Sequence, residues 1–181
     1  TKLVSAVERG AEEGRLIAWM RNDDEQNAIK ETGIDASLPD PDDPSADPVV
    51  GVYFNNLSFS KLDWYLNADT QIGQGVKNGD GTCSYRITVT LTNIMTQEEA
   101  GKLPDYVAAS APDAARDDER LNVSLFAPTG GNISDLTVEG TQFGLGAATW
   151  HGIPFYSGTV DLHAGETTTI TYTLTTSAEA G

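Results

Sequence analysis

Two stretches of alternating residues decide the fold: Thr82-Cys83-Ser84-Tyr85-Arg86-Ile87-Thr88-Val89-Thr90-Leu91-Thr92-Asn93 and Thr167-Thr168-Thr169-Ile170-Thr171-Tyr172-Thr173-Leu174-Thr175-Thr176. In each stretch one set of alternate residues is polar and dominated by Thr, and the other set is largely apolar. A period of two is typical of a strand with one solvated face and one buried face. The β-branched Thr side chain suits the solvated face of a pleated sheet. We therefore expect two long, half-buried strands.

The pattern from residue 49 to the end of the chain is that of a β protein. The segment His163–Glu166 is a compact turn, and we expect it to join the strand before it and the second Thr strand into a hairpin. Gly73–Gly81 is expected to be a turn, and Glu98–Arg120 an irregular excursion. Strands at this spacing favour an antiparallel sandwich. The further strands are expected at Val49–Asn55, Lys61–Asn67, Leu121–Phe126, Ile133–Val138, Thr149–Phe155 and Ser157–His163.

The first 48 residues have a different character. The short apolar run Arg15–Met20 is a candidate buried strand, with a helical turn as the open alternative. Asn22 or Asp23 can cap a following helix that ends at Gly33. The segment Pro39–Pro48 holds four prolines and four aspartates, which predicts a solvated loop. An earlier helix is expected from the spacing of Leu3, Val4 and Val7.

These patterns predict an α+β fold, with a short N-terminal helix-strand-helix unit followed by a mainly antiparallel β-sandwich-like domain. We place the N-terminal α/β segment, which can belong to a larger upstream domain, at residues 1–70 and the sandwich-like domain at residues 71–181. A chain of 181 residues can bury a sizeable core without a covalent staple. Cys83 is the single cysteine, so no intrachain disulfide can form, and we expect it to be a small buried hydrophobe.

Charge is the outlying feature of the composition. The chain holds 27 acidic and 11 basic residues, which gives a net charge of −16. Such a chain repels nucleic-acid phosphates and anionic lipid, and its basic residues form no cluster. It has no apolar run long enough for a transmembrane helix. Because it begins at Thr1 and not at Met, we take it as a fragment, so missing targeting signals carry no information.

No catalytic motif is complete. Ser58-Phe59-Ser60-Lys61 matches the Ser-x-x-Lys pattern of penicillin-recognising enzymes, but it lies before an expected strand and its companion motifs are absent. His151 and His163 are the only imidazoles, and we expect both in turns or on the surface. The sequence therefore favours a chain that is not an enzyme, although catalysis stays an open alternative.

Two groups of acidic residues could gather oxygen ligands for Ca²⁺, although neither fits the twelve-residue Ca²⁺ loop. We expect solvated loops and no cofactor, with a weak Ca²⁺ site as the alternative. The weak candidates in the first group are Asp40, Asp42, Asp43 and Asp47, and the second group is Asp113, Asp117, Asp118 and Glu119.

Aromatic residues offer a second kind of candidate site. In a sandwich most of them belong to the core, but carbohydrate-binding modules leave such rings on a wet face, where they stack on sugars. Trp64 and Tyr65 are adjacent in an expected strand, so at most one of them is a core residue. The set comprises Tyr53, Trp64, Tyr65, Trp150, Phe155 and Tyr156.

Four segments, taken in order, carry a family resemblance. They are Leu16–Trp19 with Glu25-Gln26 and Gly33–Pro39; Val52–Asn56 with Lys61–Leu66; Thr88–Asn93 with Leu103–Val107; and Ala164–Ile170. Across almost its whole length the chain resembles the C-terminal part of a family of large envelope proteins of Gram-positive bacteria, chiefly actinobacteria, catalogued as a domain of unknown function (number four-zero-one-two). The family often has Pro in the last turn, where this chain has Ala164.

The resemblance implies an extracytoplasmic, cell-surface piece that is tethered by an upstream transmembrane segment and is β-rich at this end. It establishes no catalytic residue. Within the matching segments, Lys61 and Asp63 are expected on the same side of a strand, where they can bind a partner jointly or form a surface ion pair. The candidate binding residues are Asn55, Asn56, Lys61, Asp63, Trp64, Tyr65 and Trp150.

Three functions follow as hypotheses. The first is a non-catalytic envelope module that acts as a scaffold or binds wall polymer or another envelope protein. The second is a polymer-acting hydrolase or transferase whose paired carboxylates are completed by a missing N-terminal region. The third is a spacer. A flat, wet aromatic face favours the first hypothesis, and a deep cleft with two convergent carboxylates favours the second.

Overall fold

The computed structural model describes residues 5, 7, 9–11, 16–35, 42, 48–139, 141–142 and 146–180. The chain divides into two compact units, Thr1–Pro39 and Asp40–Gly181. We expected the division at residue 70. Strands β1 (Gly51–Asn56) and β2 (Leu66–Ile72), however, pair with strands of the second unit, so its sheets begin before that residue.

In the first unit, the helix expected after Asn22 is α2 (Asp23–Glu31). The Asn22 side chain accepts hydrogen bonds from the backbone N–H groups of Asp24 and Glu25, and Gly33 follows the helix at φ 72°. The strand expected at Arg15–Met20 is absent from its described residues, 16–20, which have no regular secondary structure. These residues pair with no strand in the described chain, and their apolar side chains are largely exposed. The first expected helix and the loop Pro39–Pro48 lie mostly outside the described residues.

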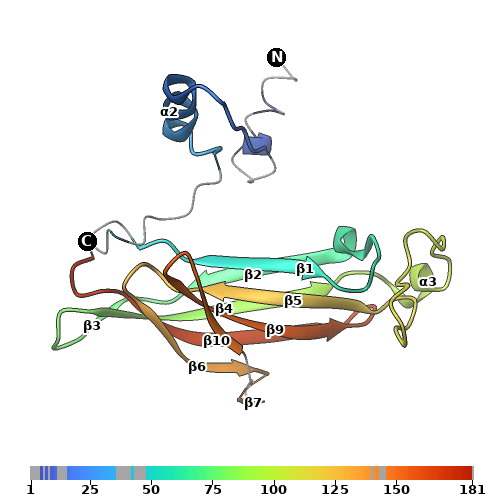
Figure 1. Ribbon diagram of the computed structural model, residues 1–181. Coiled ribbons are helices and arrows are strands. Elements are labelled where there is room, and N and C mark those ends of the chain that lie inside the picture. Colours follow the sequence, from blue (N-terminus) through green and yellow to red (C-terminus); the bar gives the residue numbers. More distant parts are fainter. Residues whose placement is uncertain are drawn as a thin grey trace. The chain divides into compact units, whose positions relative to one another are not determined.

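The second unit consists of two antiparallel sheets (Figure 1). We name them sheet A, with strand order β1-β5-β9-β8, and sheet B, with order β2-β4-β10-β6-β7 and β3 also paired with β4. This confirms the mainly antiparallel, sandwich-like architecture. The remaining bounds are β3 (Val76–Lys77), β4 (Cys83–Asn93), β5 (Glu119–Phe126), β6 (Asn132–Val138), β7 (Thr141–Gln142), β8 (Gly146–Trp150), β9 (Ile153–Leu162) and β10 (Thr167–Thr175).

The two Thr-rich strands, β4 and β10, are neighbours in sheet B. Val89 lies opposite Ile170, and the Thr side chains of both strands share the other face of the sheet, except for Thr168, which lies opposite Leu91 and is buried. Their apolar residues pack with those of β5 and β9 in the main core, because each sheet buries one face against the other. That core comprises Ile87, Val89, Leu91, Leu121, Val123, Leu125, Ala127, Ile133, Val160, Leu162, Ile170, Tyr172 and Leu174.

The turn His163–Glu166 exists, but the hairpin expected around it is wrong. β9 belongs to sheet A and β10 to sheet B, so this turn carries the chain from one sheet to the other. Asn93 fixes the crossing, since its backbone N–H donates to Glu166 O and its backbone O accepts from Gly165 N. Alternation reports which residues are buried and not which sheet a strand joins, so the sequence could not separate a hairpin from a crossing.

Two further strand assignments are corrected. The strand expected at Thr149–Phe155 is interrupted by the tight turn His151-Gly152, with φ of 48° and 81°, which joins β8 to β9. The strand expected at Lys61–Asn67 begins with the 3₁₀ helix η1 (Leu62–Tyr65). The Leu62 backbone N–H bonds to the Ser60 hydroxyl, and Leu62 is fully buried in a second cluster with Met95, Leu103, Ala108 and Ala164.

A short helix, α3 (Gln97–Ala100), starts at a capping box between Thr96 and Glu99 within the otherwise irregular segment before β5. None of the helices in the described part of the chain has the length and apolar content of a membrane span.

Candidate functional site

The outer face of sheet A is the surface of this chain that best fits a binding site. In an antiparallel sheet, residues directly opposite one another point to the same face. Register therefore places Tyr53, Ser124 and Ser157 in one row, and Asn55, Asn122 and Thr159 in the next. We call this surface the aromatic–amide face; it comprises Tyr53, Asn55, Asn122, Ser124, Phe126, Trp150, Phe155, Ser157 and Thr159.

One edge of the aromatic–amide face is built from aromatic rings. Tyr53 meets Phe126 edge-on, with ring centroids 5.5 Å apart, and Phe126 stacks on Phe155 at 4.9 Å. Tyr53 is 53% exposed. A methyl group at Gly51 would lie 2.3 Å from Cε2 of Tyr53, so the absence of a side chain there makes room for the ring. Gly51 and Phe126 together define the position of the exposed Tyr53 ring on the sheet.

Trp150 extends this aromatic edge. It lies two residues along β8 from Ala148, which is opposite Phe155, so it shares the same face. Its indole is 54% exposed and meets the His151 ring edge-on at 5.0 Å.

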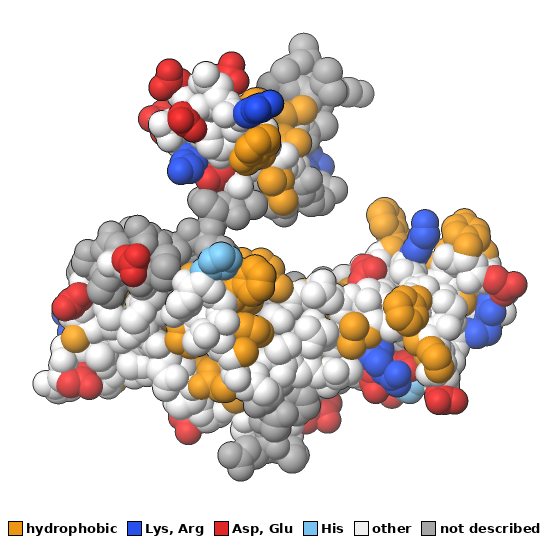
Figure 2. All heavy atoms as spheres, viewed as in Figure 1, with side chains coloured by type: hydrophobic (Ala, Val, Ile, Leu, Met, Phe, Trp, Pro, Cys, Tyr) orange, Lys and Arg blue, Asp and Glu red, His pale blue; other side chains and the backbone are white. Residues whose placement is uncertain are grey.

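The middle of the face carries uncharged hydrogen-bonding groups. The Ser157 hydroxyl donates to Asn122 Oδ1 at 2.8 Å, and the Ser124 hydroxyl donates to Ser157 Oγ at 3.4 Å. These bonds fix the orientation of the Asn122 amide and turn its NH₂ group away from Ser157. Charged side chains lie mainly toward the ends of the second unit, and the surface over the middle of β5 and β9 is largely uncharged (Figure 2).

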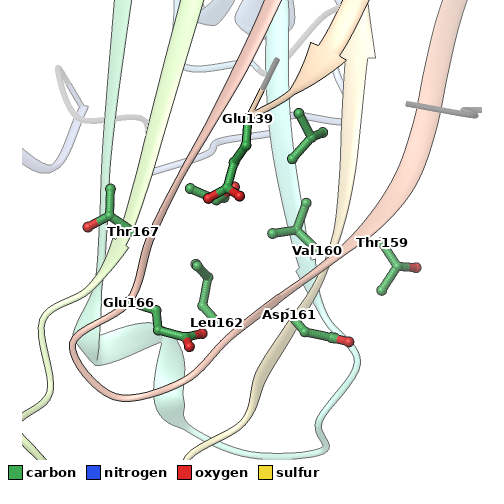
Figure 3. A pocket seen from close by; sticks show the side chains of 9 residues that line it. Glu139, Thr159, Val160, Asp161, Leu162, Glu166 and Thr167 are labelled. Carbon is green, nitrogen blue, oxygen red and sulfur yellow. The ribbon is translucent and has the colours of Figure 1, made fainter. Parts of the chain in front are cut away.

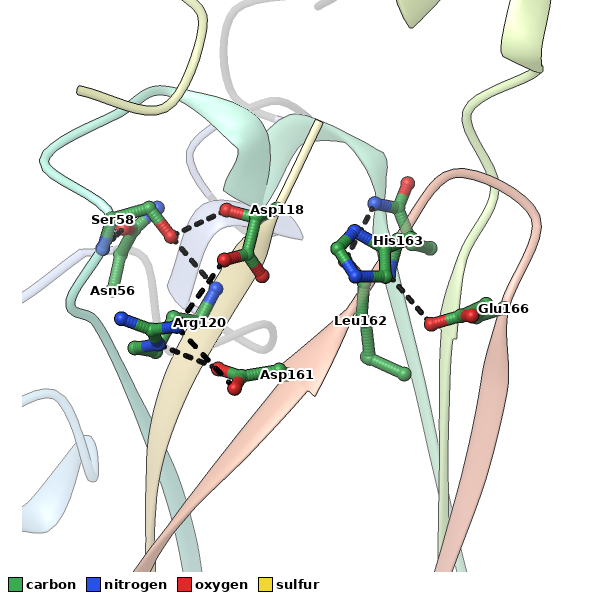
Figure 4. A network of polar contacts seen from close by, with 9 residues as sticks. Asn56, Ser58, Asp118, Arg120, Asp161, Leu162, His163 and Glu166 are labelled. Carbon is green, nitrogen blue, oxygen red and sulfur yellow. Dashed lines mark hydrogen bonds and ion pairs between the residues drawn. The ribbon is translucent and has the colours of Figure 1, made fainter. Parts of the chain in front are cut away.

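Charge begins only beyond those rows, where Arg120 lies opposite Asp161. Arg120 Nε donates to Asp161 at 2.7 Å, and its Nη2 lies 3.4 Å from Asp118 (Figure 4). Burial, with the nearby Asp161 charge second, raises the pKa of the Asp118 carboxyl, and its Oδ1 has no partner in the described chain. The two carboxyl groups offset the charge of this guanidinium.

The structure separates the residues expected to form one site. Asn55 and Trp150 lie on the aromatic–amide face, whereas Asn56 organises the loop that follows β1. Asn56 Nδ2 donates to Ser60 Oγ at 2.9 Å and to Asp63 Oδ2 at 3.1 Å, and its Oδ1 accepts from Ser58 N. Lys61 and Asp63 do not share a strand face: Lys61 Nζ lies 5.8 Å from the Tyr106 ring centroid.

Trp64 and Tyr65 lie in η1 and not on opposite faces of a strand. Trp64 is 86% exposed, and Tyr65 packs against the second hydrophobic cluster. Trp64 belongs to the end of the sandwich that carries α3, since the neighbouring Tyr65 O accepts from Ile94 N just before that helix. Phe59, Ile94 and Tyr106 are also exposed. The same loop holds Phe59 at φ 51°, a strained conformation for a bulky residue.

Ser58 and Lys61 are not arranged as a nucleophile and its activating base. Ser58 is fully buried, and its hydroxyl donates to Asp118 O at 2.6 Å and accepts from Arg120 N at 2.7 Å (Figure 4). Both roles of the hydroxyl are therefore used in holding the start of β5. His163 lies at the sheet-crossing turn, where its backbone N–H donates to Glu166, and His151 lies in the β8–β9 turn.

A groove of about 430 Å³ lies between β9 and β10 and is lined by three carboxylates, those of Glu139, Asp161 and Glu166 (Figure 3). They do not converge: Asp161 turns away toward Arg120, and Glu166 accepts the His163 backbone N–H. The groove is therefore not the cleft with two facing carboxylates that a polymer hydrolase requires.

Glu119 is the most perturbed acid of the described chain. It is 0% exposed, and within the residues that the structure describes neither carboxyl oxygen has a hydrogen-bond partner. Burial, with the Asp63 charge second, raises its pKa to about 8. Such an acid is protonated at neutral pH, but its enclosed oxygens cannot reach a substrate on the surface.

The residues considered for Ca²⁺ do not form a site in the described part of the chain, where no three His, Cys, Asp or Glu side chains are placed to hold a metal ion. Asp42 is exposed, and Asp40, Asp43 and Asp47 lie outside the described residues. In the second acidic group, Asp117 accepts the Ala164 backbone N–H and Asp118 pairs with Arg120.

Tyr53, Phe155, Asn55 and Trp150 of this face were candidates from the sequence, whereas its other polar residues were not. Asn122, Ser124 and Ser157 occupy the polar positions of alternating strands, a signal that was available. Alternation alone does not give the register between β5 and β9, which places these three side chains beside one another.

Comparison of the chain with protein-family models, with curated proteins and with solved structures gave no match. The resemblance to the actinobacterial envelope family stays a prediction.

Proposed function

We propose that this chain is a non-catalytic, extracytoplasmic envelope module that binds wall polymer through the aromatic–amide face. The observation that carries the proposal is the composition of this face: exposed aromatic rings beside an uncharged amide and hydroxyl network, on a chain of net charge −16. Polymer chains rich in hydroxyl groups bind to surfaces of this chemistry, because rings cover their apolar sides and amides meet their polar groups.

The rigidity of the face supports binding. The Tyr53 ring is held between Gly51 and Phe126, and the Asn122 amide is held by Ser157. Groups already fixed in place lose little conformational entropy when a ligand arrives, so more of the contact free energy appears as affinity.

The cell-surface location rests on the resemblance and includes a tether by an upstream transmembrane segment. An envelope protein is the second partner considered. The exposed group at the other end of the sandwich, Phe59, Trp64, Ile94 and Tyr106, favours it, since Trp, Tyr and Phe are enriched at protein interfaces.

The enzymatic alternative has one observation in its favour. Glu119 has a pKa of about 8 and faces the charge of Asp63, and acid–base pairs of enzymes are made of carboxyls in contrasting environments. The full burial of Glu119 weighs against this alternative, because a general acid has to reach the leaving group.

The proposal is tested by co-sedimentation of the purified chain with Gram-positive cell-wall sacculi, with and without Ca²⁺, at low and moderate salt. We expect saturable binding that survives moderate salt and does not require Ca²⁺. Absence of binding in every condition contradicts the proposal and leaves a spacer or a half-site.

A further inference from the structure

We infer that the polymer bound by the aromatic–amide face is an uncharged glycan strand that runs across the strands of sheet A, along the aromatic edge, and not an anionic wall polymer. This inference rests on the proposed function and names its ligand class. It follows from three features of the face: its free hydrogen-bond donors, its lack of charge and the direction of its aromatic row.

The free donors are amide groups. Asn122 Oδ1 is occupied by the Ser157 hydroxyl, so the amide presents its NH₂ group to the ligand. In the described chain neither that NH₂ group nor the Asn55 side chain has a hydrogen-bonding partner, and Asn55 lies directly opposite Asn122. Amide N–H groups donate to sugar hydroxyl oxygens, and an amide carbonyl accepts from sugar hydroxyls.

The charge distribution separates the two classes of polymer. The face has no Lys or Arg in the rows from Phe126 to Asn122, and the first cation, Arg120, is paired with both Asp161 and Asp118. A phosphate-bearing polymer finds no counter-charge there and is repelled by the net charge of −16. An uncharged glycan meets neither obstacle, so its binding does not depend on charge complementarity.

The aromatic row sets the orientation of the ligand. Tyr53, Phe126 and Phe155 come from β1, β5 and β9 and lie side by side across the sheet, with the exposed Trp150 on β8 beyond them. Neighbouring strands are about 4.8 Å apart, so the four strands span roughly 14 Å, enough for a few sugar residues. A glycan that lies along this row stacks on exposed rings at both ends, and its hydroxyl edge lies over Ser124, Ser157 and Asn122.

The test compares four probes on the whole chain: intact sacculi, sacculi stripped of anionic polymer by acid extraction, soluble chitohexaose, and poly(glycerol phosphate). Wild type is compared with Tyr53→Ala, Asn122→Ala and Trp64→Ala. The last variant removes an aromatic residue outside the face that is more exposed than Tyr53, at 86% against 53%. Circular dichroism confirms that all variants are folded.

We expect binding to stripped sacculi at least as strong as to intact sacculi, measurable binding of chitohexaose, no binding of poly(glycerol phosphate), and little change with salt. Tyr53→Ala should weaken glycan binding by about tenfold and Asn122→Ala by a few-fold, with Trp64→Ala unchanged. Binding that is lost on stripping overturns the inference while the proposed wall binding stands. Failure to bind intact sacculi overturns both.

Discussion

The Tyr53 ring stands edge-on to the Phe126 ring, with centroids 5.5 Å apart and planes at 88°. This pair joins β1 to β5 on the outer face of sheet A, and the Phe126 ring stacks in turn on Phe155 of β9. Edge-to-face pairs of this kind contribute about 1 kcal/mol beyond the area they bury. The contact with Phe126 therefore restricts the exposed Tyr53 ring, and a restricted ring suits a surface on which a polymer stacks.

Gly51→Ala should weaken wall binding by several-fold with a small effect on stability. The added methyl group would lie 2.3 Å from Cε2 of Tyr53 and must displace the ring. No chemical group of the face is removed. The measurement is the binding isotherm on sacculi, together with denaturant unfolding to check the fold.

The matched control is Gly79→Ala, where a methyl group meets nothing within 4 Å. Both substitutions change the entropy of the unfolded chain alike. If Gly51→Ala binds as well as Gly79→Ala does, the placement of the Tyr53 ring has no part in binding.

Trp150→Ala and Trp64→Ala separate the two ends of the sandwich. Both indoles are exposed, but only Trp150 shares the aromatic–amide face. We expect Trp150→Ala to reduce sacculus binding by about tenfold and Trp64→Ala to leave it unchanged. The opposite ranking would move the binding site to the end formed by η1 and the loop around Tyr106.

Much of the fold could be predicted from alternation. The two Thr-rich strands, the helix after Asn22 and the β-rich character from residue 49 onward are confirmed. The missed features depend on partners distant in sequence. The turn at His163 crosses between sheets because Asn93 pairs with it, and η1 forms because Leu62 enters a pocket made by Met95 and Leu103.

The candidate site was less predictable than the fold. Asn55 and Trp150 are 95 positions apart in the chain and share a face only through the order β1-β5-β9-β8. Conversely, Asn55 and Asn56 are adjacent, and alternation turns them to opposite sides, so one faces the proposed ligand and the other fixes a loop. Asn55 and Asn56 were therefore assigned to one candidate site because they are adjacent in sequence, although the strand places them on opposite sides of the sheet.

Glu119→Gln should change the pH dependence of stability. The pKa of Glu119 is about 8 in the folded chain, above the 4.5 that is ordinary for a glutamate. The folded chain therefore retains a proton that the unfolded chain loses, so the free energy of unfolding falls as pH rises from about 5 to about 8. Glutamine cannot ionise, and the variant should be about 1–3 kcal/mol more stable than wild type at pH 9, measured by denaturant unfolding at pH 5, 7 and 9.

Glu98→Gln is the control for that measurement, since it removes the same charge at an exposed position. Its pH profile should follow that of wild type. A Glu119→Gln profile with the same slope as wild type between pH 5 and pH 8 would mean that Glu119 is already ionised in the folded chain.

Ser58→Ala should destabilise the chain by about 1–3 kcal/mol, because it removes the partner of the partly buried Arg120 backbone N–H, which bonds to the Ser58 hydroxyl. Wall binding should persist under conditions where the variant is folded, since Ser58 does not lie on the aromatic–amide face. Thermal unfolding and the sacculus isotherm check both parts. Unchanged stability with lost function would point instead to a chemical role for the hydroxyl.

The most direct test of the central claim is the binding isotherm of wild type and Tyr53→Ala on cell-wall sacculi at moderate salt. The account predicts saturable binding by wild type and an affinity lower by about tenfold for a folded Tyr53→Ala variant. Equal affinities for the two chains, or no binding by wild type, would contradict the assignment of the aromatic–amide face as the wall-binding surface.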